Sequence, residues 1–224
     1  METHKHLIIT LDGPAGAGKS TVAKHLAKLL GISYLDTGAM YRALTLKALR
    51  LGIKFDDEKI LTDLAKNTVI DFTEMPDGSL HVRLDGEDVA LDIRSLEVTN
   101  NTFYAARTAG VRELMVGWQK EIGLKHSIVT DGRDQGTVVF PKADFKFYMD
   151  ANFEERVQRR LKELQEAGKA VDAGQLKKDM QDRDQKDFTR AVGPLKKAGD
   201  AIVIDSTHLS IQQTVEEIMK HIQI

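Results

Sequence analysis

The 224-residue chain contains no cysteine, which excludes disulfides, thiolate metal sites and a cysteine nucleophile. It has no excess of charge either, because 32 Lys and Arg balance 34 Asp and Glu to a net charge of −2, so nothing indicates nucleic-acid binding. The first apolar run is too short for a signal peptide, and none reaches the about 18 residues of a membrane span. We expect a cytoplasmic protein with no membrane or nucleic-acid partner. The lack of a long apolar surface stripe favours a monomer.

Short apolar runs alternate with segments of helical periodicity along most of the chain. Buried strands are expected at residues 7–11, 33–35, 127–130, 145–150 and 201–206, with helices between them. This alternation predicts an α/β fold, a five-stranded parallel sheet with helices on both faces. The carboxyl ends of such strands meet at one edge, and polar motifs follow four of these strands.

Two segments depart from this rhythm. Between residues 69 and 89, apolar and polar residues alternate around the turn signals Pro76-Asp77-Gly78 and Asp85-Gly86, which predicts a small antiparallel β insertion. Residues 177–200 are dense in charge and poor in apolar side chains, so we expect an exposed, mobile lid. We expect one domain over residues 1–224, with residues 36–108 as a subdomain that contains the insertion.

A glycine-rich motif follows the first predicted strand. Residues 13–20 match GxxxxGK[ST], a loop whose backbone amides face a nucleotide phosphate. Lys19 would reach the β- and γ-phosphates, and the Ser20 hydroxyl would bind Mg²⁺. The residues expected to hold ATP are Gly13, Pro14, Ala15, Gly16, Ala17, Gly18, Lys19, Ser20 and Thr21.

The rest of the chain favours a transferase over a nucleotide switch. The guanine-reading motif Asn-Lys-x-Asp of regulatory GTPases does not occur. Arginines on separate predicted loops suit a second anionic substrate beside ATP; they are Arg42, Arg133, Arg183 and Arg190. A phosphate monoester has a second pKa of about 6, so it can attack the γ-phosphorus without a general base. No Ser-His-Asp set or other obvious base stands out in the sequence.

Four segments together resemble one family: GPAGAGKST, LDTGAMYRALTLKAL, IVTDGRDQGTVVFP and RDQKDFTRAVGPLKKAGDAIVIDS. They closely resemble the bacterial cytidylate kinases, nucleoside monophosphate kinases of the P-loop class, from about Leu7 onward. The resemblance implies Mg²⁺-dependent transfer of the ATP γ-phosphoryl group to CMP or dCMP, giving CDP or dCDP. It also implies that the β insertion enlarges the monophosphate-binding subdomain, residues 36–108.

The resemblance further implies that Thr37, Arg112 and Asp134 contact cytosine. It implies that Arg42 and Arg133 bind the acceptor phosphate and that Asp187 binds the sugar hydroxyl. Arg183 and Arg190 would close over the transferring group. The catalytic groups would be Lys19, Arg133, Arg183 and Arg190. The chemistry agrees, because a carboxylate suits the exocyclic amine of cytosine and an arginine suits N3 and O2. Uracil has a carbonyl in place of that amine.

Plainer interpretations stay open. Thr37 could be a helix N-cap, Asp134 could pair with Arg133 or another loop cation, and Arg112 could be a surface residue. Arg156, Arg159 and Arg160 are expected to form mostly a solvated face, although one of them could help at the ATP phosphates. Two other functions also stay open: a related kinase with another acceptor, such as dephospho-coenzyme A or UMP, and a slow nucleotide-dependent switch.

Overall fold

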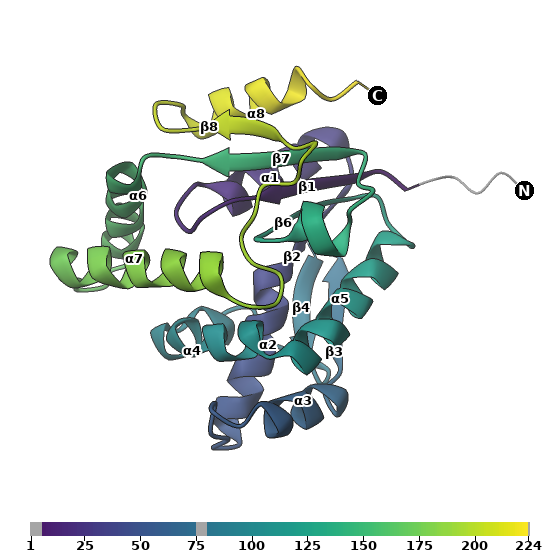
Figure 1. Ribbon diagram of the computed structural model, residues 1–224, viewed down its shortest axis with the longest axis vertical. Coiled ribbons are helices and arrows are strands. Elements are labelled where there is room, and N and C mark those ends of the chain that lie inside the picture. Colours follow the sequence, from purple (N-terminus) through teal and green to yellow (C-terminus); the bar gives the residue numbers. More distant parts are fainter. Residues whose placement is uncertain (1–5, 75–79, 224) are drawn as a thin grey trace, which may run out of the picture. The chain divides into compact units, whose positions relative to one another are not determined.

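The computed structural model describes residues 6–74 and 80–223. Five strands form one sheet in the order β2-β6-β1-β7-β8 (Figure 1). Their bounds are Ile8–Asp12 for β1, Ser33–Asp36 for β2, Ile128–Gly132 for β6, Phe145–Asp150 for β7 and Ile202–Asp205 for β8. The pairs β1–β7 and β7–β8 are parallel, with Leu11 opposite Phe147 and Phe147 opposite Ile202. The predicted α/β fold with a five-stranded parallel sheet flanked by helices is confirmed.

The chain divides into two compact units. The first comprises Met1–Ile8 and Ala27–Thr130, and the second comprises Ile9–Leu26 and Asp131–Ile224. The first unit contains α2 (Thr37–Arg50), α3 (Glu58–Lys66), a 3₁₀ turn η1 (Asp92–Arg94), α4 (Leu96–Arg107) and α5 (Ala109–Gly123). The second contains a π-helical turn η2 (Gln135–Val139), α6 (Phe153–Glu166), α7 (Ala173–Thr189) and α8 (Ile211–Met219). Helix α1 (Lys19–Leu30) begins in the second unit.

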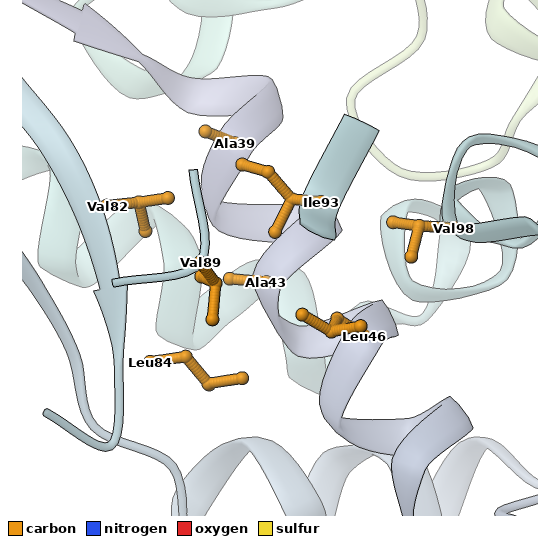
Figure 2. Packing of buried hydrophobic residues seen from close by; sticks show 8 residues of the cluster. All are labelled: Ala39, Ala43, Leu46, Val82, Leu84, Val89, Ile93 and Val98. Atoms are coloured by element: carbon orange, nitrogen blue, oxygen red, sulfur yellow. The ribbon is translucent and has the colours of Figure 1, made fainter. Parts of the chain in front are cut away.

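The core of the first unit joins α2 to a small second sheet. Ala39, Ala43 and Leu46 are spaced at one helical face of α2, and Figure 2 shows them beside side chains from β4 (Leu80–Leu84), from the turn η1 and from α4. The other members of this cluster are Val82, Leu84, Val89, Ile93 and Val98. Each fully buried aliphatic side chain of this kind contributes about 1.5–3 kcal/mol, so the cluster holds the second sheet against α2.

That second sheet is the predicted β insertion. Strands β3 (Ile70–Glu74), β4 (Leu80–Leu84) and β5 (Glu87–Asp88) pair antiparallel in chain order. Asp85 and Gly86 join the last two strands with φ of 50° and 86°. Two consecutive positive φ angles define the type I′ hairpin turn that Asp-Gly favours, so this turn prediction is confirmed. The turn predicted at Pro76-Asp77-Gly78 lies outside the described residues.

The N-cap of helix α2 lies one residue earlier than was expected. The Asp36 side chain accepts a hydrogen bond from the Ala39 backbone N–H at 2.8 Å and is the N-cap. Thr37 is therefore the first helical residue, and the interpretation of Thr37 as the N-cap was wrong.

In the second unit, the helix after β7 is capped by a side chain. Asn152 accepts a hydrogen bond from the Glu154 N–H and caps α6, and Val157 and Leu164 on this helix are buried. The next helix, α7, lies beside α6 and occupies much of the segment expected as a lid (Figure 1). The expectation that this segment is exposed throughout was wrong, because α7 buries Met180, Asp184 and Asp187. Within the described residues, no helix combines the length and apolarity needed to span a membrane.

Candidate active site

The glycine loop lies between β1 and α1, and its glycines are needed for its shape. Gly13, Gly16 and Gly18 have φ of 150°, 78° and 86°. A Cβ added at Gly13 would lie 2.0 Å from the Met149 carbonyl oxygen, and one at Gly16 would lie 3.0 Å from the Arg156 carbonyl oxygen. No other residue fits both the backbone conformation and the space. The loop can therefore turn its amides inward and deliver Lys19 and Ser20 at the start of α1.

Lys19 folds back over this loop. Its Nζ donates a 2.7 Å hydrogen bond to the Pro14 carbonyl, and the residue is only 5% exposed. Burial and then the neighbouring Arg133 lower the pKa of Lys19 to about 7, against the opposing pull of Asp131 and Asp187. The amine is thus a buried cation that its surroundings only partly balance. A polyphosphate at the loop would supply the missing negative charge and raise this pKa.

Ser20 contacts a carboxylate that the sequence analysis left without a role. The Ser20 hydroxyl donates a 2.8 Å hydrogen bond to Oδ2 of Asp131, a buried residue near the end of β6. A hydroxyl and a carboxylate are hard oxygen ligands of the kind that Mg²⁺ takes together with phosphates and water. Among the described residues, no group of three or more His, Cys, Asp or Glu side chains is arranged to hold a metal ion. Asp131 directly follows the strand expected at residues 127–130, and that position was the signal that could have found it.

Charged residues predicted for the acceptor and the lid meet in pairs in the second unit. Nε of Arg133 lies 2.7 Å from Oδ2 of Asp187, and Nη2 of Arg190 lies 3.5 Å from Oδ1 of Asp134. Burial would raise the pKa of Asp187, but Arg133 and then Arg183 hold it below the ordinary value. Burial would likewise lower the pKa of Arg133, yet Asp187 raises it. A cation paired with Asp134 is Arg190, at the end of α7, so the interpretation that Asp134 pairs with a loop cation is borne out.

The expected solvated face of α6 was wrong for its first arginine. Arg156 is 7% exposed, and its Nη1 donates to the Ala15 carbonyl of the glycine loop at 2.8 Å. The same Nη1 lies 2.6 Å from Oδ2 of Asp184 on α7, and Nε donates to the Ala151 carbonyl. One guanidinium therefore connects the loop, the start of α6 and α7. Sequence analysis missed Asp184 altogether, because helical periodicity does not show that a charged side chain is buried.

The other two arginines of α6 differ from Arg156. Arg159 donates to the backbone carbonyl of Ser206 at 2.6 Å, and the Ser206 hydroxyl donates to the Ala17 carbonyl at 3.2 Å. Arg159 thus supports the glycine loop through Ser206, which sequence analysis also missed. Arg160 forms a 2.8 Å ion pair with Glu163 and is more exposed. Arg159 and Arg160 are both partly exposed, so of the three arginines only Arg156 is buried.

Three predicted substrate residues belong to the first unit. Arg42 donates to both carboxylate oxygens of Asp36, at 3.1 and 3.0 Å. Arg112 is 2% exposed, with Nη1 3.4 Å from the Tyr41 hydroxyl and from the Ala106 carbonyl. The interpretation of Arg112 as a surface residue was wrong. Thr37 is buried as well, whereas Arg42 is partly exposed.

Comparisons with known proteins agree on one family. The Cytidylate kinase family model matches residues 9–224. A cytidylate kinase from Desulforamulus reducens is 49% identical over 219 residues, covering 98% of each chain. One from Clostridioides difficile is 46% identical over 219 residues, covering 98% of this chain and 99% of the relative. A solved structure of an uncharacterized protein from Eubacterium ventriosum matches with a TM-score of 0.52 and 15% identity over 97% and 98% of the two chains, a likeness of fold alone.

Proposed function

This chain belongs to the cytidylate kinase family, and we propose that it transfers the γ-phosphoryl group of ATP to CMP or dCMP, giving CDP or dCDP. One observation of geometry carries the proposal. The Ser20 hydroxyl, at the end of the glycine motif, donates a 2.8 Å hydrogen bond to Asp131, and Nε of Arg133, two residues further on, lies 2.7 Å from Oδ2 of Asp187 on α7. Phosphate-binding and substrate-binding motifs that are far apart in the sequence thus share one charged centre.

The glycine loop and Lys19 bind the donor. Inward backbone amides and the start of α1 attract the phosphates, and Lys19 exchanges its bond to the Pro14 carbonyl for phosphate oxygens. Ser20 and Asp131 would hold Mg²⁺, which would neutralise part of the negative charge of the phosphates. Arg156 and Ser206 hold the carbonyls of Ala15 and Ala17, which keeps the loop in shape.

The acceptor is held by arginines and recognised by a carboxylate. We assign the CMP phosphate to Arg42 and Arg133, the sugar hydroxyl to Asp187, and the cytosine edge to Thr37, Arg112 and Asp134. The burial of Arg112 and Asp134 supports this, since a polar site away from water discriminates strongly between partners that can and cannot pair with it. An ionised Asp134 would accept from the cytosine amine and would repel the uracil carbonyl.

Transfer then needs no protein base. An oxygen of the CMP phosphate attacks the γ-phosphorus in line, a P–O bond forms to it, and the bond to the β-phosphate oxygen breaks, releasing ADP. Lys19, Arg133, Arg183 and Arg190 stabilise the charge on the transferring group. We assign residues 177–200 as the lid whose closure excludes water, which would otherwise accept the phosphoryl group, and residues 36–108 as the monophosphate-binding subdomain.

An ADP-release assay with CMP, dCMP, UMP, AMP or no acceptor tests the proposal. We expect turnover that depends on the acceptor and is fastest with CMP or dCMP. Turnover fastest with UMP or AMP would indicate a related kinase with another acceptor. Slow ADP release that is independent of any acceptor would indicate a nucleotide switch, and either result would refute the proposal.

A further inference from the structure

Asp12 is a buried carboxylate that the mechanism above does not use. It ends β1, directly before Gly13, and is 4% exposed. Its Oδ1 accepts a hydrogen bond from the Gln135 N–H at 2.8 Å, and its Oδ2 accepts one from the Gly136 N–H at 2.7 Å. Each oxygen therefore binds one of two consecutive amides that lie 123 and 124 residues further along the chain.

These two amides are the first N–H groups of η2. The first N–H groups of a helical turn have no acceptor inside it, and the side chain of the preceding residue commonly caps them. Here that residue is Asp134, yet its side chain makes no capping bond to the described residues of η2. Its carboxylate instead lies 3.5 Å from Nη2 of Arg190. Asp12 therefore caps η2, and the Asp134 side chain does not.

The approach of Asp12 depends on a glycine. A Cβ added at Gly136 would lie 3.0 Å from Oγ1 of Thr10, 3.3 Å from Cδ of Lys146 and 3.4 Å from Oδ2 of Asp12. The first two distances are closer than ordinary van der Waals contact. Gly136 therefore lets the η2 backbone lie directly against β1, where the Asp12 carboxylate reaches both amides.

We propose that Asp12 is a positioning residue for pyrimidine recognition: by capping η2, it keeps the Asp134 carboxylate out of the cap and fixes it relative to the glycine loop, in the position from which it accepts from the exocyclic amine of cytosine. This rests on the proposed function, because it takes Asp134 as the residue that reads the base. Asp12 itself acts only through the η2 backbone and does not touch the nucleotide.

The electrostatics of Asp12 fit this role. Burial raises the pKa of Asp12 to about 6, although the Gly136 and Gln135 amides and Lys19 lower it, and Asp134 adds to the rise. Tyr148, opposite Asp12 on β7, is a further titratable neighbour. Above this pKa the ionised carboxylate accepts a hydrogen bond from each of the two amides. Below it, one oxygen carries a proton and the cap weakens, so cytosine selectivity should fall in acid.

The test is a double-mutant cycle on substrate selectivity in the full chain. Asp12→Asn keeps the shape but presents only one acceptor oxygen. We expect the ratio of kcat/KM for CMP over UMP to fall on the order of tenfold to a hundredfold. Changes at the ATP site cancel in this ratio, because both acceptors use the same donor. In an Asp134→Ala background, adding Asp12→Asn should change the ratio by less than about twofold. Asp12 acts on selectivity through Asp134, and the effects of two coupled substitutions on the free energy do not add.

Thr10→Val is the matched control. Thr10 lies on β1, two residues before Asp12, and its buried hydroxyl makes no hydrogen bond to the described residues. The control should keep the wild-type ratio. Gly136→Ala offers a second route if Asp12→Asn does not fold, since the added methyl group would push the amide away from Asp12; it should lower the same ratio.

The outcomes separate the two proposals. Amide hydrogen exchange at Gln135 and Gly136 should speed up in Asp12→Asn but not in Thr10→Val, with or without substrate. An unchanged CMP-to-UMP ratio in Asp12→Asn, or effects of Asp12→Asn and Asp134→Ala that multiply in full, would overturn the positioning role. Absence of CMP phosphorylation by the wild-type chain would instead overturn the proposed function.

Discussion

Arg133 and Asp187 form a 2.7 Å ion pair between Nε and Oδ2, although their proposed roles lie with different parts of CMP. The pair joins the loop after β6 to α7, and Arg190 joins Asp134 to the end of the same helix. Because Arg133 and Arg183 lower the pKa of Asp187, its stabilising contribution is present above the ordinary carboxylate pKa. That contribution is lost as the pH falls through the lowered value. The docking of α7 should therefore survive mild acid.

Replacing Lys19 by Ala should abolish efficient transfer without unfolding the chain. Loss of a buried charge that stabilises the transferring phosphate costs on the order of a hundredfold or more in kcat. Lys28→Ala, an exposed lysine later on α1, is the control and should keep wild-type turnover. Steady-state rates and circular dichroism measure both effects. Wild-type turnover in Lys19→Ala would remove the phosphate-loop assignment.

Binding of ATP should take up a proton at Lys19. With a pKa of about 7, the Lys19 amine is mostly neutral at about pH 8, and bound phosphates raise the pKa so that it becomes charged. At about pH 6 the amine is already charged and takes up little, because this lies below its pKa. Calorimetry in buffers of different ionisation enthalpy measures the uptake. Lys19→Ala should remove the difference between the two pH values, and persistence of that difference would contradict the assignment.

Asp134→Ala should narrow the preference for CMP over UMP by at least about tenfold, since a buried carboxylate that pairs with the cytosine amine is lost. The ratio of kcat/KM for the two acceptors is the measurement. Asp172→Ala, which removes the exposed N-cap of α7, is a control for general damage to that helix. If Asp134→Ala keeps the wild-type ratio, this residue does not read the base.

Arg183→Ala should lower kcat more than it weakens ATP binding. The proposed role of Arg183 develops only as the lid closes on the transferring group, so its loss affects the transition state more than the ground state. Steady-state kinetics give kcat, and equilibrium titration gives the Kd of ATP. An effect confined to KM would argue against a transition-state role.

Arg156→Ala should both destabilise the chain and weaken ATP binding. It leaves Asp184 as a buried charge without its guanidinium, which costs about 3–5 kcal/mol. For a chain of this size we expect Tm to fall by roughly 6–20 °C. Arg160→Ala, which removes only a partly exposed ion pair with Glu163, should change Tm by no more than about 2 °C. Calorimetry measures Tm, and equal losses in both variants would show that Arg156 has no special role at the loop.

Sequence patterns predicted the sheet, the insertion and the phosphate loop because these depend on local chemistry. Hydrophobic runs mark β1 and β7, and the Asp85-Gly86 turn needs two positive φ angles that few residues adopt. The loop glycines are recognisable for the same reason. These features are encoded within a few neighbouring residues each.

The carboxylates that support the site were not predicted, because their roles depend on partners far along the chain. Asp131 pairs with Ser20 across 111 residues, and Asp12 caps amides more than 120 residues away. Helix α7 reads as solvated from its charges, yet Asp184 and Asp187 are buried against arginines from other elements. Burial of paired charges follows from tertiary packing, and the local hydrophobic periodicity of the sequence does not show it.

Arg156 has a consequence for how this protein can change over evolution. Its Nε donates to the Ala151 carbonyl before α6, and its Nη1 donates to the Ala15 carbonyl of the phosphate loop and to the Asp184 carboxylate of α7. A substitution that improves one of these contacts disturbs the others at the same time. The shape of the phosphate loop and the docking of α7 therefore depend on the same residue, and a change in either one alone requires compensating substitutions elsewhere.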